Sequence, residues 1–126
     1  MKFNAVLILD DLIQTNNEMI LKNPLTSILV PFIPTLFSFS TYISFFEVKT
    51  NVPYSIEIDV LDPDENIITS HKAPIKIDHA ENESNFSGSM HIIFKNVEFK
   101  SQGTHSIRVS NGEHSLQFYF PVILGS

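Results

Sequence analysis

The chain has 126 residues, of which 43% are hydrophobic and none is cysteine, and it carries 8 basic and 14 acidic side chains. This hydrophobic content excludes a disordered chain and is sufficient for one folded domain over residues 1–126. The net charge of −6 argues against a nucleic-acid-binding face, and the absence of thiols excludes disulfides, zinc fingers and cysteine catalysis.

The apolar run at residues 5–9 is ended by Asp10 and Asp11. A secretory signal needs about 7–15 apolar residues and a cleavage site with small side chains, so the sequence predicts a cytoplasmic protein. The run also predicts a first strand over residues 3–10. Its nearly continuous apolar character is typical of a strand that is covered on both faces.

Residues 14–22 fit two alternatives, a short helical turn or two strands that meet at Asn16-Asn17. A second strand is expected at residues 19–22, where Asn23-Pro24 would end it, and a third at residues 27–30.

A long uncharged segment runs from Asn23 to Phe46. It is long enough to cross a membrane as a helix, but it contains several prolines and many hydroxyl groups. Its second half alternates with a period of two, with large apolar side chains at the odd positions Phe37, Phe39, Ile43 and Phe45. This period predicts a core strand over residues 36–48 and no membrane contact.

Residues 54–61 alternate in the same way and predict another strand. The polar residues 62–66 that follow are typical of a turn. Weaker strands are expected at residues 67–72 and 75–78, interrupted by Pro74, which favours an edge position because it has no N–H to donate.

The alternation of residues 90–94 slips by one position further on, because Val97 and Phe99 continue the apolar face in place of Asn96. A slip of one residue moves every later side chain to the opposite face of a strand. The sequence therefore predicts a bulge or a bend between Phe94 and Val97.

A hairpin is expected at the C-terminal end, where Asn111-Gly112 separates two alternating runs and has the favoured sequence of a type I′ turn. A two-residue turn there places the apolar residues of both strands on one face. The predicted register pairs Val109 with His114, Ile107 with Leu116, His105 with Phe118, Arg108 with Ser115, and Ser106 with Gln117.

These elements predict an all-β fold, an Ig-like or Greek-key antiparallel β-sandwich of about seven to nine strands with at most a short helical turn. In many Greek-key sandwiches a tyrosine near the start of a late strand bonds back to the backbone and fixes the crossing loop. His105 holds that place here, two residues after Gly103. We interpret it as a corner residue, with a functional histidine as the alternative.

Several segments also carry a resemblance: residues 5–11, Pro31-Phe32 before the aromatic strand, residues 61–64, and residues 103–109 with the final hairpin. In their order the chain resembles a family of uncharacterised bacterial proteins of similar length. The resemblance implies a small β-sandwich and carries no assigned activity.

No catalytic motif is present in the sequence. Ser87-Gly88-Ser89 lacks the glycine pattern of a nucleophile elbow, and neither a P-loop nor a dinucleotide-binding glycine motif occurs. The 5 histidines include no His-x-x-x-His pair. The sequence therefore predicts a protein that is not an enzyme, with no catalytic, cofactor-binding or metal-binding residues.

Two acidic loops leave calcium binding as an alternative. Calcium needs six to eight oxygen ligands in one place, and two loops at the same end of a sandwich can supply them. The candidate ligands are Asp62, Asp64 and Glu65 in one loop, and Asp78, Glu81 and Glu83 in the other.

The aromatic residues exceed what one small core obviously needs, since the chain has 11 phenylalanines. Phe45-Phe46 and Phe118-Tyr119-Phe120 place aromatic rings on both faces of their strands. An outward surplus would mark an interface. We therefore expect a non-catalytic interaction or structural module that self-associates or binds a protein partner through an aromatic sheet face or edge. The alternative is a ligand-binding sandwich for a carbohydrate, a small apolar molecule or calcium.

Overall fold

The computed structural model describes residues 1–78 and 86–125. Within these ranges the chain forms nine strands and no helix. The strands are β1 (Lys2–Gln14), β2 (Met19–Leu25), β3 (Ile28–Val30), β4 (Thr35–Val48), β5 (Tyr54–Leu61), β6 (Ile67–Ile75), β7 (Phe86–Phe99), β8 (Gly103–Ser110) and β9 (Ser115–Leu124).

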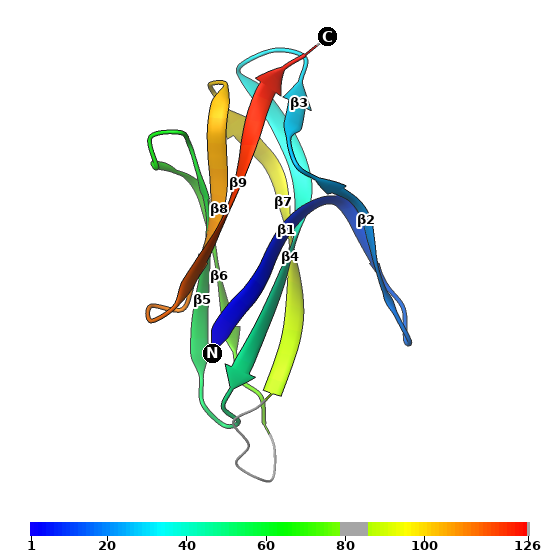
Figure 1. Cartoon of the computed structure of the whole chain (residues 1–126), viewed down its shortest axis with the longest axis vertical. Coiled ribbons are helices and arrows are strands. Elements are labelled where there is room, and N and C mark those ends of the chain that lie inside the picture. Colours follow the sequence, from blue (N-terminus) through cyan, green and yellow to red (C-terminus); the bar gives the residue numbers. More distant parts are fainter. Residues whose placement is uncertain (79–85, 126) are drawn as a thin grey trace.

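The strands form two sheets that pack face to face, as Figure 1 shows. One sheet has the order β2-β1-β4-β7 and the other has the order β3-β9-β8-β5-β6. Among the described residues, neighbouring strands pair in antiparallel orientation, except that β3 and β9 are parallel. The prediction of a β-sandwich is confirmed.

The core lies between the sheets and is built from the inward positions of alternating strands. The alternation predicted for residues 36–48 is confirmed in β4, where Phe39, Ile43 and Phe45 are buried and Phe37 packs against them. The largest fully buried side chains include Phe39, Phe99 and Phe120. Burial of these rings removes apolar area from water, which favours folding.

Residues 14–22 form two strands, so the second of the two alternatives is correct. The turn between β1 and β2 is closed by a 2.9 Å hydrogen bond from the Thr15 N–H to the Glu18 carbonyl. The expected end of β2 at Asn23-Pro24 is wrong, because the strand continues to Leu25. Asn23 adopts a left-handed conformation (φ 57°), and β2 is an edge strand, which tolerates a proline.

Strand β6 is also continuous through its proline. The predicted interruption at Pro74 is wrong, but its predicted edge position is confirmed, since β6 is the outermost strand of its sheet. Because no strand of the described residues pairs with the outer side of β6, the missing N–H of Pro74 interrupts no backbone hydrogen bonds there.

The bulge predicted in β7 is confirmed. Phe94 pairs with Phe39 and Val97 pairs with Phe37, so β7 takes three steps where β4 takes two. Asn96 has a positive φ of 54°, and its N–H donates to the Ser38 hydroxyl at 2.9 Å. The extra residue returns Val97 and Phe99 to the core face.

The predicted register of the C-terminal hairpin is wrong by two residues. The observed partners are Val109 with Leu116, Ile107 with Phe118, His105 with Phe120, Arg108 with Gln117, and Ser106 with Tyr119. A type I′ turn over Asn111-Gly112 needs positive φ at both residues, and only Gly112 has one (90°). A shift of two residues leaves every side chain on its predicted face, so the predicted burial of His105, Ile107 and Val109 is confirmed.

Asn111 gives the physical reason for this register. Its side-chain oxygen accepts hydrogen bonds from the backbone N–H groups of Glu113 and His114 at 3.0 and 2.8 Å. Its side-chain amide donates to the Met1 carbonyl at 2.9 Å. Asn111 therefore flanks the turn and binds the N-terminal strand, which leaves Gly112 and Glu113 at the tip.

Candidate functional site

The two acidic loops considered for calcium do not meet. Asp62 follows β5, whereas Asp78 follows β6 at the other end of the same antiparallel hairpin, where Tyr54 pairs with Ile75. Eight strand residues separate these ends by about 25 Å. Within residues 1–78 and 86–125, no group of three or more His, Asp or Glu side chains could hold a metal ion. Glu81 and Glu83 lie outside the described residues.

The carboxylate of Asp62 already has backbone partners. It accepts hydrogen bonds from the N–H groups of Asp64 and Asn66, both at 2.9 Å. This is the arrangement of an Asx turn, in which an aspartate closes its own loop. The local geometry of the turn therefore explains the aspartate at position 62.

His105 occupies the corner position that the sequence indicated. Its ring is fully buried, and Nδ1 lies 2.9 Å from the Gly103 carbonyl oxygen. The ring packs edge-on against Phe99 and is stacked near Phe120, with centroid distances of 5.1 and 6.1 Å. Its Nε2 atom is buried and has no hydrogen-bond partner among the described residues.

Most of the phenylalanine rings are buried in the core or pack against it. Two aromatic residues are exposed instead: Phe32 in the loop before β4, and Tyr119 on the outer face of β9. The outward aromatic surplus is thus small, and the exposed hydrophobic surface is mainly aliphatic. The exposed large hydrophobic residues are Ile20, Leu29, Phe32, Leu36, Val52, Ile67, Ile93, Tyr119, Ile123 and Leu124.

Half of these exposed residues come from β3, the following loop, the start of β4 and the end of β9. We call this group the apolar end surface, formed by Leu29, Phe32, Leu36, Ile123 and Leu124. Leu29, Phe32 and Leu36 are 64%, 62% and 60% exposed. Strand β3 and the end of β9 lie beside each other at the top of Figure 1, where Leu29 pairs with Ile123.

The segments that form the apolar end surface carry no charge. Residues 23–46 and 114–126 contain no Asp, Glu, Lys or Arg, although 17% of the whole chain is charged. Phe32 and Leu36 line a shallow hollow with Pro34 and Thr35, and Glu98 is the charged residue at its rim. The uncharged segments form strands and loops, and the described residues include no helix that could cross a membrane.

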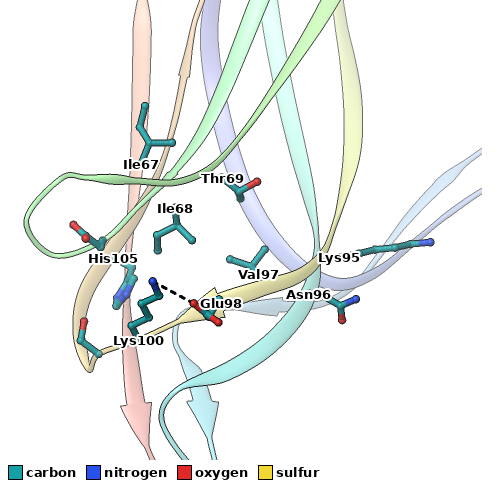
Figure 2. A pocket seen from close by; sticks show the side chains of 11 residues that line it. Ile67, Ile68, Thr69, Lys95, Asn96, Val97, Glu98, Lys100 and His105 are labelled. Atoms are coloured by element: carbon teal, nitrogen blue, oxygen red, sulfur yellow. Dashed lines mark ion pairs between the residues drawn. The ribbon is translucent and has the colours of Figure 1, made fainter.

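A second feature is a cleft of about 390 Å³ between the edge strands β6 and β7, shown in Figure 2. Its lining combines apolar, polar and charged groups. We call it the seam cleft, lined by Asp62, Ile67, Ile68, Thr69, Lys95, Asn96, Val97, Glu98, Lys100, Ser101 and His105. The bulge in β7 matters here, because it turns Val97 inward between Asn96 and Glu98.

The outer face of the second sheet carries a buried ion pair. The Asp59 carboxylate, whose side chain is 4% exposed, accepts hydrogen bonds from Arg108 at 3.1 Å and from the Ser70 hydroxyl at 2.6 Å. These partners come from three neighbouring strands, β8, β5 and β6. The pair fixes the relative positions of these strands, and its oxygens are already bonded, so it offers little to a ligand.

Comparison with known protein families identifies the family of this chain. A model described as a family of unknown function, DUF6941, matches residues 5–122. The chain belongs to this family. The comparison with curated proteins found no match.

Family membership confirms the resemblance to an uncharacterised family of small proteins. Membership of this family carries no assigned activity. Neither the apolar end surface nor the seam cleft was predicted as a site from the sequence. The uncharged residues 23–46 are a sequence signal for the apolar end surface. The sequence does not show which of their apolar side chains are exposed. The seam cleft has no signal of its own, because its residues come from separate segments.

Proposed function

We propose that this chain is a non-catalytic interaction module that associates with a second copy of itself through the apolar end surface. The supporting observation is the collection of five exposed hydrophobic side chains on segments free of charge. Depletion of charged residues distinguishes the centre of a protein interface from the rest of a protein surface. Exposed apolar side chains also lose their unfavourable contact with water when a partner covers them.

Charge restricts where a second copy can approach this chain. Each chain has a net charge of −6, so two copies repel each other across most orientations. The segments that form the apolar end surface add no charge to this repulsion. Apolar surface is self-complementary, so the same residues can serve on both sides of a two-fold interface.

The position of β3 adds a second argument. It is the outermost strand of its sheet and lies within the apolar end surface. Edge strands commonly carry charged residues or prolines that prevent pairing with another chain, and residues 28–30 are Ile-Leu-Val. We propose the same cytoplasmic location that the sequence led us to expect. Disulfides are rare in the cytoplasm, and this chain has no cysteine that could form one.

Sedimentation or multi-angle light scattering on the purified chain tests the proposal. The wild type is expected to have the mass of a dimer at high micromolar concentration, and Leu36→Glu or Leu29→Glu is expected to be a monomer. Ile93→Glu is the matched control, because Ile93 is 56% exposed on β7, outside the apolar end surface. A monomeric wild type, or equal dissociation by Ile93→Glu, would refute self-association through this surface.

A further inference from the structure

The seam cleft lies at the open side of the sandwich, where β6 and β7 are the edge strands of their sheets. In Figure 2 Ile67, Ile68 and Thr69 approach from β6, while Val97 and Glu98 approach from β7. Its volume of about 390 Å³ is within the usual range of small-molecule sites. Apart from Glu98, which borders both features, it shares no lining residue with the apolar end surface.

His105 gives the cleft a hydrogen-bond acceptor of defined identity. The Gly103 carbonyl can only accept, so the imidazole donates to it from Nδ1. In the neutral ring, Nε2 then carries a lone pair and accepts. This atom is buried without a partner in the described chain, and buried acceptors are usually bonded to protein or to a bound molecule.

The charged side chains around the cleft are bonded to other groups of the chain or point away from the cleft. Lys100 forms an ion pair with Glu98 at 3.4 Å, drawn as a dashed line in Figure 2. The Asp62 carboxylate is bonded to its own turn, and Lys95 extends away from the cleft in Figure 2. An anionic ligand would therefore find no unpaired cation directed at it, which favours a neutral one.

We propose that the seam cleft binds a small neutral molecule with an apolar body and a hydroxyl group. The hydroxyl donates to His105 Nε2, and the apolar body lies against Ile68 and Val97. Lys100 lines the cleft together with His105, forms the ion pair with Glu98 that Figure 2 draws, and has a side chain that is 79% exposed. It therefore moves aside at little cost when the hydroxyl reaches the ring.

Phenol and anisole are matched probes, because anisole replaces the phenolic hydrogen with a methyl group. In long-range ¹H–¹⁵N spectra of the wild-type chain, phenol is expected to shift the Nε2 resonance of His105 and not that of His91, which is exposed on β7 outside the cleft. Anisole is expected to bind at least about tenfold more weakly, as the loss of one hydrogen bond implies.

Variants at Thr69, which lines the cleft from β6, separate binding from folding. Thr69→Trp is expected to abolish the phenol-induced shift by filling the cleft, whereas Thr69→Val, of nearly equal volume, retains it. The proposal is overturned if phenol leaves His105 unchanged, if anisole binds equally well, or if Thr69→Trp still binds phenol. An Nε2 resonance typical of a protonated nitrogen in the free chain would also overturn it.

Discussion

The hairpin turn between β8 and β9 allows a sharp test of how its register is fixed. Replacing Asn111 by glycine removes three hydrogen bonds, to Glu113, His114 and Met1, of 3.0, 2.8 and 2.9 Å. A neutral hydrogen bond contributes about 0.5–1.5 kcal/mol, and two of the three lie in a partly solvated turn. We therefore expect Asn111→Gly to lower the free energy of unfolding by about 2 kcal/mol.

The alternative register makes the opposite prediction. In a type I′ turn over Asn111-Gly112, residue 111 would need a positive φ, and glycine would be neutral or favourable there. Urea denaturation followed by far-ultraviolet circular dichroism measures the difference. Thermal unfolding should show a decrease in Tm of about 6–10 °C, at about 3–5 °C per kcal/mol for a domain of this size.

Asn111→Asp is the matched control. It keeps an acceptor for the two turn N–H groups and loses only the donor to the Met1 carbonyl, so about half of the loss is expected. An Asn111→Gly variant as stable as the wild type would refute the argument that this side chain sets the register.

Four further predictions follow from the core, the bulge, the ion pair and the loops. Phe99→Ala should lower the free energy of unfolding by about 3–5 kcal/mol in urea denaturation, because the ring is fully buried, and a loss under about 1 kcal/mol would contradict the packing. Asn96→Gly should leave the free energy of unfolding nearly unchanged, whereas Asn96→Val should lower it by about 1–2 kcal/mol in the same assay, because residue 96 has a φ of 54°. Equal stability of the two variants would contradict the bulge. In a double-mutant cycle of Asp59→Ala and Arg108→Ala, the coupling energy between the two side chains should be about 1–2 kcal/mol. This is less than the coupling energy of a fully buried ion pair, because Arg108 is 37% exposed. Additive effects of the two substitutions would disprove the ion pair. Calcium should leave Tm unchanged in a thermal shift titration, since Asp62 and Asp78 lie at opposite ends of a hairpin; a saturable increase would show a site.

The apolar end surface and the seam cleft differ in how far they could be predicted from the sequence. The absence of charge in residues 23–46 can be read from the sequence. Apolar residues in this segment occupy both buried and exposed positions. Phe39 is buried and Leu36 is 60% exposed because β4 has one face on the core and one on solvent. Leu36 lies on the face opposite to Phe39, and its hydrophobicity alone does not show that no other part of the protein covers it.

Period-two alternation by itself determined most strands, their inward faces and the bulge before Val97, because a one-residue slip moves a side chain to the opposite face. The same periodicity cannot detect a two-residue slip, which preserves both faces. Tertiary contacts decided that slip, since Asn111 binds the N-terminal strand at Met1, 110 residues away. The seam cleft likewise exists only because folding brings β6, β7 and His105 together, so its hydrogen-bond acceptor was set by three-dimensional packing.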